Sequence, residues 1–380
     1  MNDMKGKQGL VCMGLLLVLS SCHTGKQITA SGLQRKDFQT EVNGQHTDLF
    51  TLSNKQGMEV CITNYGARVV SILVPDRNGK REDVVCGFST ITEYMEQRQN
   101  FGSTVGRYIG RILNARFTLD GVEYKLVPNN GKSGHISHGG NPGFADRIWK
   151  VEQADTHRVR LSYLSPDGEN GFPGNLKVTL VYSLGEDDNA LDLTYEATTD
   201  APTVLNLSHH SFFNISGNFT KSVEDQQLWV DADRFTPYDD KKCVTGEYLP
   251  VAGTPLDFRM PHTIGECIDA DHPQLKVVNG YDHTWELNTK GDDTRPAAWV
   301  YDPASGRKME IFTTEPGMQI YTGNGLKGKM TGKGGIAYPF RSAVCFETMH
   351  FQDSPNQPGF PSTVLRPGEV FRSHTVYKFE

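Results

Sequence analysis

The stretch LKVTLVYSLGEDDNALDLTYEA, residues 176–197, indicates the fold class. Its two halves, LKVTLVYSL and LDLTYEA, are rich in Val, Leu, Thr and Tyr, and they largely alternate between apolar and polar side chains, as a half-buried strand does. The residues between them, GEDDNA, have the composition of a turn. The stretch therefore predicts two strands joined by a tight connection.

The same pattern extends in both directions along the chain. MEVCITNYG, ARVVSILVP and VRLSYLS read as strands, and PDRNGK and SPDGENGFPGN read as turns. Only ITEYMEQRQNF, residues 91–101, can be read as either a short helix or a loop. Many short strands between regular turn signals predict a sandwich or a barrel. We expect an all-β fold in which residues 37–380 form one large antiparallel β-sandwich.

The N-terminus has the composition of an export signal. Lys5 and Lys7 precede an apolar stretch, residues 10–19, that is short for a membrane-spanning helix. The stretch ends in Leu-Ser-Ser-Cys at Cys22, which resembles a bacterial lipobox. We expect a lipoprotein signal peptide over 1–21, a lipid on Cys22, a tether over 22–36, and a location at the bacterial membrane facing the periplasm or the cell surface. A plain signal peptide or a short membrane anchor is the alternative.

Composition narrows the classes of partner and cofactor. The 380 residues carry a net charge of −7 and no basic cluster, so we expect no nucleic-acid partner. No CxxC motif occurs, and the histidines of HISHGG and SHH lack a convincing ligand spacing. We therefore predict neither a metal nor a cofactor. The cysteines beyond residue 22 are odd in number, and most are expected to lie in the β core: Cys61, Cys86, Cys243, Cys267 and Cys345.

One carboxylate lies inside an apolar run, AVCFETMHFQD, residues 343–353. The run predicts a central strand covered on both faces. An ionised Glu347 there would cost several kcal/mol (~3–5) unless it is paired or hydrogen-bonded. Either Glu347 forms a structural ion pair with an arginine such as Arg341, or it is a catalytic base or ligand anchor.

A second informative stretch is LNLSHHSFFN, residues 205–214. In a continuous strand, His210 shares the more polar face with Asn206 and Ser208, and His209 lies with the leucines. A bulge would exchange the two assignments. Each histidine alone is more typical of a hydrogen-bonded core residue. Opposite a buried glutamate, however, His210 becomes a candidate general acid.

Further polar groups follow in separate motifs. Arg107 and Arg111 lie in VGRYIGRI, His138 in HISHGGNPGFADRIW, Asp257 in GTPLDFR and Gln319 in MQIYTGN. Asp257 can also be read as a turn or cap residue. Polar donors and acceptors mixed with aromatic side chains on a β scaffold suit a sugar.

Together these motifs resemble those of the galactose mutarotases, or aldose 1-epimerases. The resemblance begins near Asp37, reaches the C-terminus and rests on motifs in the family's order: NYGARVVSILVPDRNGKREDVV, GRYIGRI, HGGNPGFADRIW, NLSHHSFFN, GTPLDFR, NGYDHTW, YTGNGL and FETMHFQDSPNQPGFPSTVLRPGE. With the N-terminus, it suggests a bacterial lipoprotein-type member.

The resemblance implies a β-supersandwich and an isomerase that interconverts the α- and β-anomers of aldohexoses such as galactose and glucose, without a cofactor. It implies Glu347 as general base and His210 as general acid. The residues that it places on the sugar are Arg111, His138, Asp257 and Gln319. This chain departs from the pattern at two positions, since His209 and Gly110 stand where many relatives have Asn.

Three rival functions are also considered. A β-sandwich glycosidase would use Asp257 and Glu347 as its carboxylate pair. A sugar-binding lipoprotein would keep the fold without the activity. An enzyme for hexose 6-phosphates would want an additional basic cluster, and the sequence offers none that is clear.

Overall fold

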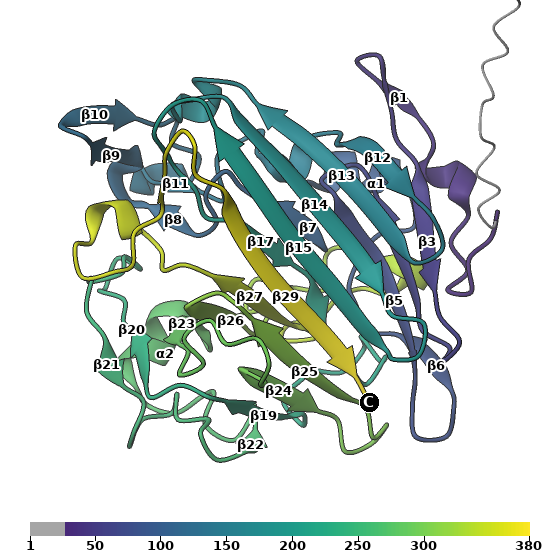
Figure 1. The fold of residues 1–380 in the computed structure, drawn as a ribbon. Coiled ribbons are helices and arrows are strands. Elements are labelled where there is room, and N and C mark those ends of the chain that lie inside the picture. The colour runs from purple at the N-terminus through teal and green to yellow at the C-terminus, as the bar shows by residue number, and fades with distance from the viewer. Residues whose placement is uncertain (1–26) are drawn as a thin grey trace, which may run out of the picture.

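The structure is a computed structural model that describes residues 27–380. The expected signal peptide and Cys22 lie outside these residues. The described chain is almost entirely β, with long antiparallel sheets that face each other (Figure 1), which confirms the predicted fold class. Neither of its two α-helices is long or apolar enough to cross a membrane.

The largest sheet forms one layer of the sandwich. It has nine strands in the order β12 (Lys150–Ala154), β13 (Arg158–Ser165), β14 (Leu176–Leu184), β15 (Ala190–Thr199), β29 (Phe371–Phe379), β25 (Lys308–Thr313), β24 (Ala298–Tyr301), β19 (Gln227–Val230) and β22 (His262–Thr263). The predicted pair of strands over residues 176–197 is β14 and β15, which are antiparallel neighbours with Leu184 opposite Leu191.

Two further sheets hold most of the remaining long strands. One has six strands in the order β18 (Phe212–Phe213), β27 (Val344–Met349), β26 (Gly317–Tyr321), β23 (Asp282–Glu286), β20 (Arg234–Thr236) and β21 (Leu249–Pro250). The other has four in the order β3 (Leu49–Ser53), β4 (Glu59–Thr63), β5 (Arg68–Pro75) and β6 (Arg81–Asp83). The run around Glu347 is therefore the central strand β27, as predicted.

Short ribbons and turns connect the sheets. The ribbons are β1 (Glu41–Val42) with β2 (Gln45–His46), β9 (Arg116–Leu119) with β10 (Val122–Lys125), β8 (Arg111–Ile112) with β11 (Ile136–Ser137), β7 (Ser103–Val105) with β17 (Ser208–His210), and β16 (Thr203–Val204) with β28 (Val364–Leu365). The 3-10 turns are η1 (Arg35–Phe38), η2 (Leu113–Ala115), η3 (Gly131–Ser133), η4 (Phe144–Asp146), η5 (Glu169–Gly171), η6 (Lys333–Gly335) and η7 (Ser354–Asn356).

Two short α-helices complete the fold. The first, α1 (Ile91–Gln97), settles the open reading of residues 91–101 in favour of a helix. A capping box starts it, because the Thr90 side chain accepts from the Glu93 N–H and the Glu93 carboxylate accepts from the Thr90 N–H. The second, α2 (Pro273–Val278), was not predicted, since its six residues are too few to show a helical period.

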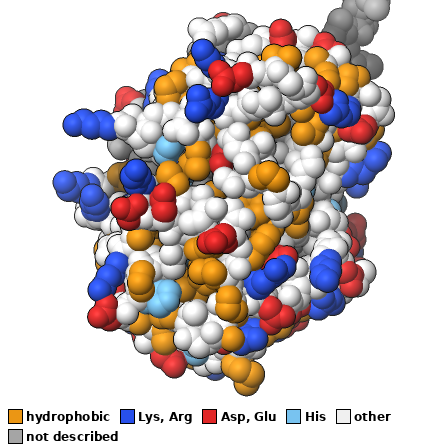
Figure 2. All heavy atoms as spheres, turned by 90° about the vertical axis from the view of Figure 1, so that its left-hand side faces the viewer, with side chains coloured by type: hydrophobic (Ala, Val, Ile, Leu, Met, Phe, Trp, Pro, Cys, Tyr) orange, Lys and Arg blue, Asp and Glu red, His pale blue; other side chains and the backbone are white. Residues whose placement is uncertain are grey.

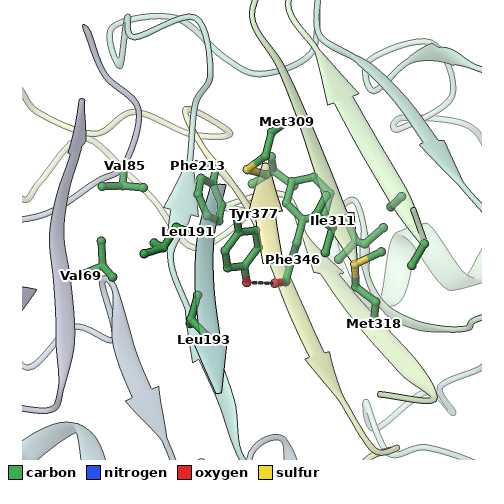
Figure 3. Packing of buried hydrophobic residues seen from close by; sticks show 14 of the residues in the cluster. Val69, Val85, Leu191, Leu193, Phe213, Met309, Ile311, Met318, Phe346 and Tyr377 are labelled. Atoms are coloured by element: carbon green, nitrogen blue, oxygen red, sulfur yellow. Dashed lines mark hydrogen bonds between the residues drawn. The ribbon is translucent and has the colours of Figure 1, made fainter. Parts of the chain in front are cut away.

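The main core lies between the nine-stranded sheet and the two smaller sheets. Figure 3 shows Leu191, Leu193 and Tyr377 of the large sheet packed toward Phe213 and Phe346 of the six-stranded sheet. The Tyr377 hydroxyl donates to the Phe346 carbonyl at 3.0 Å, which satisfies a polar group inside this apolar layer. One face of β27 is thereby fixed against the core, and the other is left to form a site.

The structure describes the second part of the expected tether, from Gln27 onward. From Gln27 to Lys36 the backbone is packed against the domain, with Leu33 buried and an isolated bridge between Ile28 and Gln34. The Ala30 N–H donates to the Glu59 carboxylate on β4 at 2.7 Å. Within the described residues, this segment is therefore part of the folded body and not a free linker.

The surface carries mixed charge. On the face drawn in Figure 2, acidic and basic side chains are interspersed, with apolar side chains between them. The net charge of −7 is in keeping with this mixture.

Candidate active site

A cavity of about 250 Å³ opens above β27 and its neighbours. Five of the six predicted catalytic and sugar-binding residues line it together with one carboxylate that was not predicted: Arg111, His138, His210, Gln319 and Glu347, with Asp282. A second cavity of about 340 Å³ shares Asn100, Arg111, Ser137 and His138 with the first, so the polar space continues beyond the catalytic residues.

Glu347 and His210 form the closest pair of titratable groups in the cavity. The Glu347 Oε1 atom lies 3.2 Å from His210 Nε2, and both side chains are almost fully buried. Arg341, the alternative partner considered for Glu347, binds Glu224 and Asp269 instead. The reading of Glu347 as a structural ion pair with Arg341 is therefore wrong.

The two adjacent histidines point in different directions, as the strand period predicts. His210 faces the cavity, while His209 is buried beside Tyr182 and accepts from or donates to Ser211 Oγ at 2.6 Å. The predicted continuous strand over 205–214 is split, because β17 pairs with β7 and β18 pairs with β27. The change of partner falls after His210, so it leaves the predicted facing of both histidines intact.

Neighbouring strands align further polar side chains beside Glu347. Thr284 on β23, Gln319 on β26 and Glu347 on β27 are direct cross-strand neighbours and form one row. Gln319 accepts from Thr284 Oγ1 at 2.5 Å and donates to Asp282 Oδ1 at 2.6 Å. These bonds fix the orientation of the Gln319 amide beside the Glu347 carboxyl.

The opposite wall comes from the ribbon of β8 and β11. Arg111 starts β8, and His138 follows β11 in a left-handed conformation with φ 52°. The His138 N–H donates to the Gly110 carbonyl at 2.9 Å, which holds the two segments together. The imidazole of His138 then meets that of His210 edge to face, with 5.5 Å between ring centroids.

Asp257 is the predicted site residue that the structure places elsewhere. Its carboxylate binds the Arg259 guanidinium through two contacts of 2.8 Å, and it does not line the cavity. The turn reading of GTPLDFR was the better one, because Arg259 lies close enough in sequence to form a local pair. Without Asp257 in the cavity, the carboxylate pair of the glycosidase alternative is not formed.

Asp282 is the aspartate that lines the cavity in place of Asp257. It begins β23 in the motif NGYDHTW, none of whose residues was predicted to belong to the site. Gln319 was predicted to contact the sugar, and Asp282 is its hydrogen-bonding neighbour. The missing information was the pairing of β23 with β26, which the strand period alone does not supply.

Burial controls the protonation of these groups. Desolvation, reinforced by the charge of Asp282 and opposed by Arg111, raises the pKa of Glu347 well above its usual range. Burial also lowers the pKa of His210 to about 4 and, together with the charges of His210 and Arg111, that of His138 to about 3. Burial therefore favours the neutral form of each group, the protonated carboxyl of Glu347 and the neutral imidazole of His210.

Comparison with known proteins identifies the family of this chain. The family model described as aldose 1-epimerase matches residues 48–378. The chain belongs to the aldose 1-epimerase family. As a member of this family, the protein is an isomerase.

Relatives of this aldose 1-epimerase family member cover nearly all of the described chain. A galactose mutarotase from Sus scrofa is 39% identical over 330 residues, which are 87% of this chain and 93% of the relative. An aldose 1-epimerase from Escherichia coli (strain K12) is 36% identical over 339 residues, 89% of this chain and 96% of the relative. The crystal structure of an aldose epimerase homologue from C. elegans has a TM-score of 0.81 at 31% identity, covering 88% of this chain and 99% of that one.

One cluster of buried side chains, made of two residues that line the cavity and a cysteine beside them, has the composition of a metal site. Ligand atoms of His210, Cys345 and Glu347 lie within 4.8 Å of one another. Burial raises the pKa of the Cys345 thiol well above its usual range, whereas a metal ligand must be a thiolate. The acid–base pair accounts for two of the three groups, and catalysis without metal or cofactor stays a prediction.

Proposed function

We propose that the protein interconverts the α- and β-anomers of aldohexoses such as galactose and glucose by acid–base opening and closing of the sugar ring. The observation that carries the proposal is the contact between Glu347 Oε1 and His210 Nε2, 3.2 Å apart in a polar cavity. Anomer exchange needs a base at the O1 hydroxyl and an acid at the ring oxygen, and this pair supplies both.

Glu347 and His210 together take one proton from the sugar and return one proton to it, so the pair neither gains nor loses a proton. Glu347, as carboxylate, takes the O1 proton while His210, as imidazolium, gives its proton to O5. The C1–O5 bond breaks and C1 becomes an aldehyde. Rotation about C1–C2 presents the other carbonyl face, and the steps then run in reverse to close the ring. Ring opening leaves a neutral carboxyl and a neutral imidazole, which are the forms that burial favours.

The other cavity residues are proposed to hold the sugar. Arg111, His138, Gln319 and Asp282 surround the acid–base pair with donors and acceptors suited to hydroxyl groups. The pKa of His138, lowered to about 3, keeps its imidazole neutral near pH 7. Asp282 is a charge-bearing neighbour of Gln319 and replaces Asp257 in this assignment.

Polarimetry tests the proposal directly. Protein lacking residues 1–22 is added to freshly dissolved α-D-galactose and, separately, to α-D-glucose, and the approach to the final rotation is followed. We expect faster approach with the wild type and a loss of about 10²–10⁴-fold in rate for Glu347→Gln and for His210→Asn. Asp257→Asn, which alters a carboxylate outside the cavity, is the matched control and is expected to retain activity.

Circular dichroism establishes that each variant is folded. Folded wild-type protein that binds galactose in calorimetry without accelerating its mutarotation would contradict the proposal and favour the sugar-binding alternative. Rates for Glu347→Gln and His210→Asn equal to that of Asp257→Asn would contradict the assignment of the acid–base pair.

We further propose that residues 1–21 are a lipoprotein signal peptide and that a lipid on Cys22 anchors the enzyme to a bacterial membrane, facing the periplasm or the cell surface. The support is the apolar stretch from Leu10 to Leu19 followed by Leu-Ser-Ser-Cys. In a bacterial host, globomycin is expected to cause accumulation of the full-length precursor. Cys22→Ala is expected to reproduce that accumulation without the drug, and unchanged processing in both cases would contradict the anchor.

A further inference from the structure

Gly110 and Gln352 share one small volume at the wall of the cavity. Gly110 lies immediately before Arg111 with φ 74°, a conformation that favours glycine. A Cβ atom placed on Gly110 would lie 2.6 Å from Cγ of Gln352, closer than real Cβ contacts allow. The glycine thus leaves the space into which the Gln352 side chain extends, and both residues line the cavity.

The Gln352 amide meets three groups at the sugar-facing wall. Its Nε2 donates to the Tyr238 hydroxyl at 2.6 Å, and burial holds the tyrosine neutral by raising its pKa to about 12. The remaining contacts are long, 3.4 Å from Nε2 to Gln319 Oε1 and 3.3 Å and 3.5 Å from Oε1 to the backbone N and Nη1 of Arg111. The short bond to Tyr238 therefore orients the Gln352 amide. The second hydrogen of Nε2 and the lone pairs of Oε1 form only long, weak hydrogen bonds.

The backbone holds this amide in place. The next residue, Asp353, donates its N–H to the Arg111 carbonyl at 2.8 Å and accepts from the Leu113 N–H at 3.0 Å. These bonds tie the segment that follows β27 to β8 and η2, and Gln352 itself is only 4% exposed. An amide that is buried, oriented and incompletely bonded is suited to a ligand hydroxyl, because a sugar can offer shorter bonds than those already present.

We propose that Gln352 contacts a hydroxyl group of the hexose and determines which hexose the enzyme accepts, in the space that Gly110 leaves open. This inference rests on the proposed function, because it assigns a specificity residue to the same cavity. The amide contributes both a donor and an acceptor, so it discriminates between epimers that place that hydroxyl on different sides of the ring.

A panel of deoxy sugars tests the contact. Wild type and Gln352→Ala are compared by polarimetry or coupled assay on galactose, glucose and their 2-, 3-, 4- and 6-deoxy forms. We expect Gln352→Ala to lower kcat/KM about tenfold for a sugar that carries the contacted hydroxyl, as the loss of one hydrogen bond predicts. For the deoxy form that lacks this hydroxyl, the two proteins are expected to be equal within about twofold.

The shared volume gives a second, independent test. Gly110→Asn introduces a residue that tolerates the left-handed conformation but collides with Gln352. We expect the single variant to lose activity and the double variant Gly110→Asn with Gln352→Ala to recover part of it. Gln357→Ala is the control for loop anchoring, because Gln357 binds Asp353 at 2.9 Å and does not line the cavity.

The outcomes separate this inference from the proposed function. Wild-type protein that accelerates no sugar overturns the proposed function. Active wild type with a Gln352→Ala variant that weakens every sugar equally, deoxy forms included, overturns the specificity role and leaves the catalytic assignment standing. The specificity role is equally overturned if Gln357→Ala reproduces the sugar-dependent pattern.

Discussion

At the scale of single residues, the proposed mechanism depends on one proton held between two buried groups, Glu347 and His210. Desolvation moves the pKa values of Glu347 and His210 in opposite directions, each toward its neutral form. The active arrangement and the resting arrangement therefore contain the same number of protons and differ only in which atom holds the proton. A pair that gains a second proton, or that loses its single proton, can no longer act as acid and base together. The proposed activity is therefore expected to fall at both acidic and alkaline pH.

The pH dependence of kcat/KM is predicted to be a broad bell. Activity is expected to fall on the acid side as a second proton enters the pair, near the lowered pKa of about 4 for His210. It is expected to fall on the alkaline side as the raised pKa of Glu347 is passed and the single proton is lost. Polarimetry corrected for buffer catalysis measures the profile, and an acid limb unchanged in Glu347→Gln and His210→Asn would contradict this origin.

Prediction from sequence was most successful for residues whose side of a strand decides their role. Period two placed His210 and His209 on opposite faces, and Glu347 stood out as a carboxylate inside an apolar strand; both observations need only local sequence. Asp257 and Asp282 could not be separated in this way. Both lie in motifs with turn residues, and only the pairing of β23 with β26 and the local bond of Asp257 to Arg259 distinguishes them.

At the scale of elements, the segment VGRYIGRI carries two arginines with different tasks. Arg107 is fully buried and donates to the carbonyls of Pro173 and Gly174 and to the Ser165 hydroxyl. Burial lowers its pKa to about 10, which leaves it charged at neutral pH. Arg111, four positions later, faces the cavity. One segment therefore joins distant loops and also supplies an arginine to the cavity.

The different surroundings of Arg107 and Arg111 predict that substituting the first lowers stability and that substituting the second lowers activity. Arg107→Met is expected to lower the free energy of unfolding by about 3 kcal/mol or more, because it leaves several buried acceptors without a donor. Arg111→Met is expected to leave the free energy of unfolding within about 1 kcal/mol of wild type and to lower kcat/KM for galactose. Urea unfolding and polarimetry measure the two quantities. Equal unfolding midpoints for the two variants would contradict this prediction.

At the scale of the whole molecule, the sequence specified the class of architecture and not the pairing of its layers. Alternation and turn composition predicted β14 and β15, and an apolar run around Glu347 predicted the central strand β27. The split between β17 and β18 was missed because it depends on which distant strand each half meets. The six residues of α2 carry too short a pattern, and the packed segment 27–36 resembles a linker in composition although its backbone bonds to β4.

The contact between Ala30 and Glu59 also fixes the side of the domain on which the described chain begins. The described chain begins beside β3 and β4, at the right of Figure 1, whereas β8 and β11, which carry one wall of the cavity, lie at the left. A support attached through residues ahead of Gln27 would therefore meet the folded body on the side of β3, across the ribbon from β8 and β11. Most of the width of the domain would then separate such a support from the wall that carries Arg111.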